Sequence, residues 1–209
     1  MPTLHSLGLF LAAGLALNLT PGPDMLYVAA RGAGEGRPAG IVSALGIGVG
    51  TLVHIALVAA GLAALLAAVP VAYMALRLGG AAYLVWLGVK ALRAAPDDGA
   101  VAELPPAPLG AIFRQGVITN VLNPKVALFF LAFLPQFVDP ARGDPALQVI
   151  ALGLLFDVSG TLVNLAVALA SSRVAARLRR TSGTTRLVQR ATGALFIGLG
   201  ARLAYGARP

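Results

Sequence analysis

Residues 38–76 read PAGIVSALGIGVGTLVHIALVAAGLAALLAAVPVAYMAL and contain no Lys, Arg, Asp or Glu. A bilayer core of about 30 Å is crossed by about 20 helical residues, so this run is too long for a single crossing. Pro70 lies near its end and cannot continue a helix, which divides the run into two crossings. The stretch therefore predicts two consecutive membrane-spanning helices, the first of which contains His54.

The rest of the chain has the same apolar character. Of its 209 residues, 58% are hydrophobic and 11% are charged, whereas soluble domains carry about a quarter charged residues. Six segments are long and apolar enough to span a bilayer, namely residues 4–30, 39–69, 71–92, 112–138, 146–172 and 187–205. We therefore predict an all-α polytopic membrane protein with six transmembrane helices and one domain over residues 1–209.

The basic residues predict the orientation of these helices. Sixteen Lys and Arg against eight Asp and Glu give a net charge of +8, which on its own invites a nucleic-acid partner. Most basic residues fall instead in the first, third and fifth loops between the predicted spans. These residues are Arg31, Arg37, Lys90, Arg93, Arg114, Arg173, Arg177, Arg179, Arg180, Arg186 and Arg190. By the positive-inside rule these loops are cytoplasmic and face anionic lipid. We expect both termini outside and no nucleic-acid binding.

Few residues are available for metal or thiol chemistry. The chain has no cysteine, which excludes disulfides and thiolate metal sites, and it has two histidines, too few for a His-rich site. We therefore expect no metal and no cofactor.

An internal repeat divides the chain into two halves. GTLVHIALVAA at 50–60 and GTLVNLAVALA at 160–170 share six of eleven positions, and similar offsets relate the first span to the fourth and the third to the sixth. Three crossings are an odd number, so the second copy must be inserted upside down. We predict two inverted three-helix repeats, residues 1–94 and 111–209, joined by a loop at 95–110; inverted repeats are common in secondary transporters.

Both halves contain a broken span. Residues 18–24 read NLTPGPD and residues 120–125 read NVLNPK. Proline lacks a backbone donor and disfavours helix before it, so a second half-helix should start at Pro23 and at Pro124, with Gly22 and Asn123 as N-caps. Irregular backbone at membrane depth is tolerated where it is buried or lines a cavity. The two breaks therefore indicate a binding site.

The half-helices place opposite charges at equivalent positions. Asp24 and Lys125 each follow the proline that restarts the helix. A lone ammonium in a membrane is costly, so Lys125 should need a negative partner, either Asp24 or a substrate carboxylate. The pair can hold a zwitterion, with Lys125 and the half-helix N-termini on its carboxylate and Asp24 on its ammonium. Mutual neutralisation of the two side chains, or snorkelling to an interface, is the alternative.

The fifth span carries the second intramembrane carboxylate. Asp157, Thr161 and Asn164 follow one another at spacings of four and three and share one helical face. Intramembrane acids are a recurring feature of proton relays, so Asp157 and Asp24 are the candidates for proton coupling. His54 corresponds to Asn164 in the repeat and is a third candidate, although one hydrogen bond to a neighbouring helix would also explain it. Gly46 and Gly50 form a small-xxx-small pattern for close helix packing.

These residues carry a resemblance to a known family. NLTPGPD at 18–24, FRQGVITNVLNPKVALFFLAFLPQFV at 113–138 and the six-span layout resemble the LysE/RhtB family of amino-acid exporters over nearly the whole chain. The resemblance implies a permease of the bacterial inner membrane that exports amino acids, driven by the proton gradient. It also implies a functional core made of Asn18, Thr20, Pro21, Gly22, Pro23, Asp24, Asn120, Asn123, Pro124 and Lys125.

The resemblance leaves the substrate open. Neutral amino acids of the homoserine, threonine or branched-chain type are favoured over Lys or Arg, because the spans offer few acids to hold a second cation. A membrane-embedded enzyme acting on a lipid is the competing class, but its reactive groups should lie near the headgroups, whereas the polar residues here lie at mid-span. A structural subunit without transport activity would enclose no polar cavity. The apolar outer surfaces leave room for a homodimer.

Overall fold

The computed structural model describes residues 4–68 and 104–174, with isolated positions between 78 and 93 and between 194 and 201. This part of the chain is helical, as predicted. Its helices are α1 (Leu4–Leu19), α2 (Pro23–Glu35), α3 (Arg37–Ala68), α5 (Leu109–Val121), α6 (Pro124–Leu128) and α7 (Pro145–Val174), with a π-helical turn η1 (Phe129–Phe133) and two 3-10 turns, η2 (Leu134–Phe137) and η3 (Pro140–Arg142). Apart from isolated helical positions, the predicted third and sixth spans, 71–92 and 187–205, lie outside the described residues.

Both predicted breaks are present. The axis bends by 48° between α1 and α2, and by 45° between α5 and the helical segment Pro124–Phe137. Gly22 is the N-cap of α2 and Asn123 is the N-cap of α6, with a proline in the first turn of each helix. The Asn123 side-chain oxygen accepts a hydrogen bond from Lys125 N at 3.0 Å. The local chemistry of proline and cap residues is therefore enough to locate both breaks.

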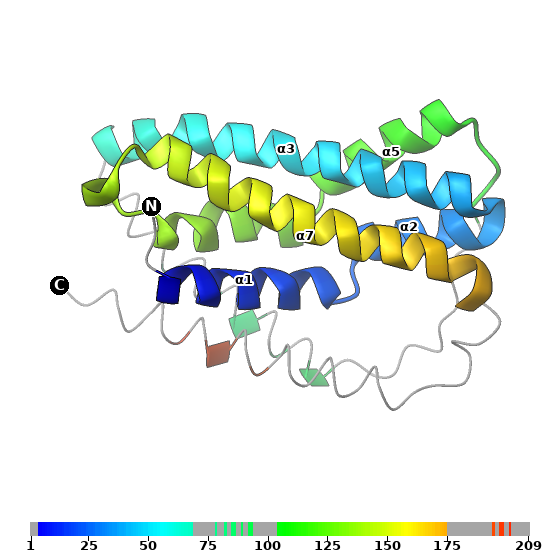
Figure 1. Cartoon of the computed structure of the whole chain (residues 1–209), viewed down its shortest axis with the longest axis horizontal. Helices are drawn as coiled ribbons and strands as arrows, with labels where there is room; N and C mark the ends of the chain where they lie inside the picture. The colour runs from blue at the N-terminus through cyan, green and yellow to red at the C-terminus, as the bar shows by residue number, and fades with distance from the viewer. Residues whose placement is uncertain are drawn as a thin grey trace.

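Two long unbroken helices run alongside the broken ones. α3 and α7 lie side by side and run in opposite directions (Figure 1). Both are long and apolar enough to cross a membrane, and up to four crossings result within the described residues if each bent pair is one span. Their bounds agree with the predicted spans 39–69 and 146–172 to within a few residues.

The end of α2 is tied to the segment before α5. α2 continues to Glu35, beyond the predicted end of the span at residue 30, and stops at Gly36, whose φ of 87° suits a residue without a side chain. Glu35 Oε2 accepts a hydrogen bond from Ala107 N at 2.8 Å, so the loop after α2 and the segment before α5 share one end of the molecule. α5 begins at Leu109, inside the stretch 95–110 expected to be loop.

Two apolar clusters make up the buried interior. One is aromatic and includes Phe10, Phe129, Phe130, Phe133 and Phe156, with the rings of Phe129 and Phe156 stacked at 4.5 Å. The other consists of Val28, Ala44, Ile47 and Ala168, from α2, α3 and α7. Ile47 of the second cluster and Phe156 of the first both border the polar site described next.

Candidate functional site

A small polar cavity lies where the broken spans meet the two long helices. Its volume is about 20 Å³, enough for about one water molecule. It is lined by Asn18, Asp24, Ile47, Thr51, Asn120, Val126, Phe156, Asp157, Gly160, Thr161 and Asn164. Every described helix from α1 to α7 contributes to this lining, so the two halves of the chain build the cavity together.

Asp24 reaches the cavity from the first turn of α2. It is 8% exposed, and its Oδ2 accepts a hydrogen bond from Asn120 Nδ2 at 2.8 Å. Its Oδ1 is buried and has no hydrogen-bond partner among the described residues. The Asn123 side-chain amide is the second hydrogen-bonding neighbour of this carboxyl group, and its Nδ2, like Asp24 Oδ1, has no other partner among the described residues. The N-terminus of α2 favours an anion at this position, so the carboxylate of Asp24 is held by the helix dipole and by the two asparagines.

The two asparagines that precede the breaks are held by the same kind of contact. A Cβ at Gly50 of α3 would lie 2.7 Å from Asn120 Cβ, and a Cβ at Gly160 of α7 would lie 3.0 Å from Asn18 Oδ1. Gly50 and Gly160 are the first residues of the two GTLV sequences, so each repeated glycine lets an asparagine of the other half approach closely. Asn18 Nδ2 also donates to Ser159 Oγ at 3.0 Å. The contacts between the halves are thus formed twice.

α7 and α3 contribute further oxygen-bearing side chains to the cavity lining. Asp157, Thr161 and Asn164 line the cavity from one face of α7, as predicted, and Thr161 Oγ1 donates to Asp157 Oδ1 at 3.4 Å. Thr51 Oγ1 lies 3.3 Å from Ile47 O and 3.4 Å from Asn120 Oδ1. These hydrogen bonds are long, so the hydroxyl and carboxyl oxygens are only weakly engaged with one another.

Lys125 has a different partner from the one expected. Its Nζ donates to Thr20 O at 2.9 Å and to Leu17 O at 3.1 Å, both at the C-terminal end of α1. Leu17 O would ordinarily pair with the amide four residues later, but that residue is Pro21, which has no N–H. Among the described residues no ion pair joins Lys125 to Asp24, although the two charges act on each other. The negative end of the α1 dipole therefore supplies the partner that the ammonium requires.

Gly22 lies directly against the Lys125 side chain. A Cβ at position 22 would lie 3.0 Å from Lys125 Nζ and 3.3 Å from Lys125 Cε. A side chain at position 22 would therefore crowd the end of the lysine, which would have to shift by a few tenths of an ångström.

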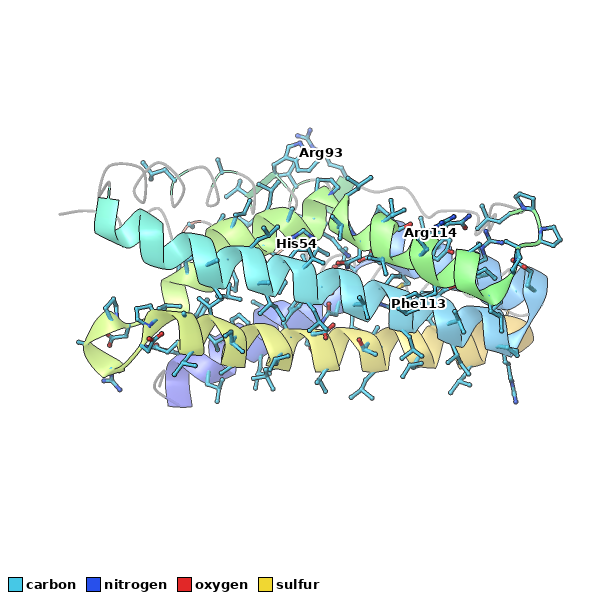
Figure 2. The ribbon with its side chains drawn as sticks, turned by 90° about the horizontal axis from the view of Figure 1, so that it is seen from above. His54, Arg93, Phe113 and Arg114 are labelled. Atoms are coloured by element: carbon cyan, nitrogen blue, oxygen red, sulfur yellow. The ribbon has the colours of Figure 1, made fainter. Side chains whose placement is uncertain are left out.

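His54 lies between α3 and α5, near the second break but not on the cavity lining (Figure 2). Its Nε2 is 3.1 Å from Asn120 O, and a carbonyl only accepts, so Nε2 carries the proton. Asn120 O is the carbonyl that the proline at position 124 leaves without its usual helical donor. The ring stacks on Phe130 with centroids 5.8 Å apart. The single hydrogen bond to a neighbouring helix, the simpler explanation of this histidine, is therefore present.

The predicted site residues separate into three groups. Asn18, Asp24, Asn120 and Asp157 line the cavity. Lys125 and the Thr20 carbonyl join the two breaks, and Thr20 Oγ1 donates to Ala16 O of α1 at 2.7 Å. The residues that shape the breaks themselves are Pro21, Gly22, Pro23, Asn123 and Pro124. Thr51 was not predicted to belong to the site, although its place beside Gly50 in the repeated GTLV sequence was the available signal.

A buried arginine at the end of α2 was also missed. Arg31 is 3% exposed, pairs with Glu35, and donates to Gln115 Oε1 at 2.7 Å and to Pro105 O at 2.8 Å. Its guanidinium lies 5.6 Å from the centre of the Tyr27 ring. The sequence analysis assigned Arg31 to the first loop. In the structure its hydrogen bonds connect α2 to α5 and to the segment that precedes α5.

Sequence comparisons find relatives over nearly the whole chain. The family model described as "LysE type translocator" matches residues 15–207. An uncharacterised membrane protein of Pseudomonas aeruginosa is 35% identical over 191 residues, covering 89% of this chain and 88% of that protein. The leucine efflux protein of Salmonella choleraesuis is 30% identical over 196 residues, covering 93% and 92%. The homoserine/homoserine lactone efflux protein of Salmonella typhimurium is 30% identical over 195 residues, covering 93% and 94%.

No solved structure matches the chain. The family match includes both breaks and both long helices. The relatives are named as membrane or efflux proteins, and the alignments cover nearly the whole length of each. The chain belongs to the LysE type translocator family.

Proposed function

We propose that this protein is a secondary transporter that exports amino acids across the bacterial inner membrane by proton antiport and alternating access. The observation that carries the proposal is the polar cavity, which lies inside the helix bundle and is lined by two carboxyl groups and three asparagine side chains. A structural subunit has no need of such a site. An enzyme acting on lipids would need its reactive groups close to the headgroups, and the family relatives with named activities are efflux proteins.

The substrate proposed is a neutral amino acid of the homoserine, threonine or branched-chain type. A zwitterion needs one anionic and one cationic partner, and Asp24 and Lys125 supply these from the two halves of the chain. Asn18, Asn120 and Asn123, together with the backbone of residues 20–24 and 123–125, would complete the binding site. The relatives named for leucine and for homoserine support a neutral side chain over a basic one.

The cavity must enlarge before it can hold such a substrate. Its 20 Å³ is far below the roughly 300 Å³ at which ligand pockets begin. We propose that the two inverted three-helix repeats, 1–94 and 111–209, move against each other and open the cavity to one side at a time. Release of Lys125 from the α1 carbonyls would leave its ammonium free for the substrate carboxylate.

The proton would be carried by the intramembrane acids. Asp24 and Asp157 line the same cavity, so a proton bound by either is lost or gained together with the substrate. His54 would influence this exchange through the Asn120 carbonyl, since Asn120 also holds Asp24. Loops one, three and five would face the cytoplasm, in contact with anionic lipid, and the apolar outer faces of the helices would permit a homodimer.

Transport by the purified protein tests this proposal. Liposomes containing the protein and a panel of labelled neutral and basic amino acids are given an imposed pH gradient. We expect gradient-driven movement of neutral amino acids, abolished in Asp24→Asn and strongly reduced in Asp157→Asn. Undiminished transport in both variants would remove both coupling assignments, and transport of basic amino acids alone would overturn the substrate class.

A further inference from the structure

We infer that Phe156 is a specificity-determining residue: its ring closes the end of the site that receives the substrate's side chain, and so limits the size of that side chain. The inference rests on the proposed function and deepens it, because the charged and amide groups assigned so far bind only the zwitterionic part of an amino acid. Phe156 belongs to α7, is 3% exposed, and lines the polar cavity.

The apolar part of the cavity lining is unevenly distributed. It consists of Ile47, Val126 and Phe156, and the other lining residues are polar or glycine. Val126 and Phe156 belong to the aromatic cluster, whereas Ile47 belongs to the second cluster. An aliphatic side chain is bound by apolar surface, because burial of its own apolar surface is the favourable contribution. The larger apolar surface lies on the side of Val126 and Phe156.

On the side of Ile47 the cavity is bounded by close backbone packing. A Cβ at Gly46 would overlap the carbonyl oxygen of Phe113, and a Cβ at Gly50 would lie 2.8 Å from Val117 O. A backbone carbonyl cannot rotate away as a side chain can, so the cavity can grow here only if α3 and α5 separate. This side is therefore poorly suited to receive a substrate side chain.

On the other side the neighbours of Phe156 are mainly side chains. Its ring stacks on Phe129 with centroids 4.5 Å apart and meets Phe130 edge-on at 5.4 Å. Gly14 of α1 also lies against it, since a Cβ there would be 3.1 Å from Phe156 Cδ2. These contacts fix the ring, which therefore presents a defined surface to the cavity. Phe129 and Phe130 begin the π-helical turn η1, and such turns are frequent at functional sites.

The apolar surface also has the right place relative to the charged groups. In an amino acid the side chain is attached to the carbon atom that bears both the ammonium and the carboxylate, so its pocket must adjoin the groups that bind these. Val126 directly follows Lys125 in α6, and Asp24 lines the same cavity as Phe156. A zwitterion held by Asp24 and Lys125 can therefore direct its side chain toward Val126 and Phe156.

The aromatic cluster offers a matched control. Phe133 is 2% exposed, belongs to the same cluster and contacts Phe129 with centroids 5.0 Å apart, but it is not part of the cavity lining. Phe133→Ala removes the same buried atoms as Phe156→Ala without changing the lining. Ile47→Ala is a second control, because it removes apolar lining on the side of the close backbone packing.

Binding of valine, leucine, phenylalanine and tryptophan is measured with the purified full chain in detergent, from the rise of the unfolding midpoint with amino-acid concentration. We expect the original chain to bind valine and leucine more tightly than the two aromatic amino acids. In Phe156→Ala the affinity for phenylalanine relative to leucine should rise by about tenfold or more, because small differences in an apolar pocket already have effects of this size. Phe133→Ala and Ile47→Ala should keep the original ratio.

Phe156→Leu keeps the inference testable if Phe156→Ala fails to fold, and it should shift the ratio in the same direction by a smaller factor. Equal affinities of the original chain for leucine and phenylalanine would overturn the inference. So would an unchanged ratio in the Phe156 variants, or an equal shift in Phe133→Ala or Ile47→Ala.

Transport of the same four amino acids in liposomes under a pH gradient separates the two proposals. Transport of neutral amino acids with a size preference that the Phe156 variants leave unchanged contradicts only the role of Phe156. Binding whose size preference changes at Phe156, without any transport, contradicts only the proposed function. If no neutral amino acid is bound or transported, both proposals are wrong.

Discussion

A methyl group at Gly50 should damage the site by separating α3 from α5. In Gly50→Ala the new Cβ would lie 2.7 Å from Asn120 Cβ and 2.8 Å from Val117 O, whereas ordinary contacts begin at 3.4 Å. One of the contacted atoms belongs to backbone, so rotation of a side chain cannot relieve both overlaps. The two helices must therefore move apart locally by about 0.7 Å, from 2.7 to 3.4 Å.

The cost can be separated from the effect of alanine on the helix itself. Overpacking of this kind destabilises a protein by about 1–3 kcal/mol, while replacement of a helical glycine by alanine favours the helix by about 0.5–1 kcal/mol. Gly61 lies on the same helix, and a Cβ added there would meet nothing within 4 Å, so Gly61→Ala receives only the second contribution. The difference in unfolding free energy between the two variants should thus be about 1–3 kcal/mol, with Gly50→Ala the less stable.

The change should also reach the transport reaction. Asn120 holds Asp24 at 2.8 Å, and displacement of a positioned group by about 1 Å commonly costs about a hundredfold in rate. Unfolding in detergent is followed by circular dichroism for both variants, and transport is followed in liposomes at equal protein content. If Gly50→Ala matched Gly61→Ala in stability and transported at the original rate, the close approach of α3 to Asn120 would be refuted.

Three further experiments test the second break and the orientation of the chain in the membrane. Lys125→Gln should abolish transport and lower the unfolding midpoint, because two carbonyls at the end of α1 lose a charged donor. Lys125→Arg should keep the unfolding midpoint closer to that of the original chain. Equal midpoints for Lys125→Gln and the original chain would contradict the role of the ammonium. His54→Phe should remove the side-chain donor of Asn120 O, which still accepts from Asn123 N at 2.9 Å, and should destabilise the chain by about 0.5–1.5 kcal/mol in chemical unfolding. An unchanged unfolding midpoint would argue against this hydrogen bond. Because the chain has no cysteine, single cysteines can be introduced at the exposed positions 141 and 34 as Ala141→Cys and Gly34→Cys. In intact cells, a membrane-impermeant thiol reagent should label the cysteine at 141 but not the one at 34. The reverse labelling pattern would show that the orientation is opposite to the predicted one.

The parts of the structure that depend on local sequence were predictable. Pro23 and Pro124 each begin a new helix, and Gly22 and Asn123 are the N-caps. These features depend only on adjacent residues, because a proline lacks its own N–H group and the cap residue directly precedes it. The spacing of Asp157, Thr161 and Asn164 likewise placed them on one face of α7, and all three line the cavity. The length of the apolar runs predicted the spans containing α3 and α7 to within a few residues.

The partners of the charged groups were not predictable in the same way. Lys125 is bonded to carbonyls more than 100 residues away, and a backbone carbonyl leaves no mark in the sequence of side chains. The sequence predicted that the ammonium of Lys125 needs a negative partner. Which group is that partner depends on how the two breaks face each other in the folded chain. Arg31 shows the same limit, because its burial depends on Gln115 and Pro105, which lie more than 70 residues further along the chain.

The two prolines that break the spans have a consequence that joins the halves of the molecule. Pro21 removes the helical donor of Leu17 O, and Pro124 removes that of Asn120 O. Each of these carbonyls receives a side chain from the opposite half, Lys125 in the first case and His54 in the second. The repeated glycines bring the same segments together, but the side chains that complete the contacts differ in charge. The contacts at the two breaks therefore match in position but not in chemistry. Gly50 with Asn120 and Gly160 with Asn18 set the spacing between the segments, whereas Lys125 and His54 supply a different donor at each break.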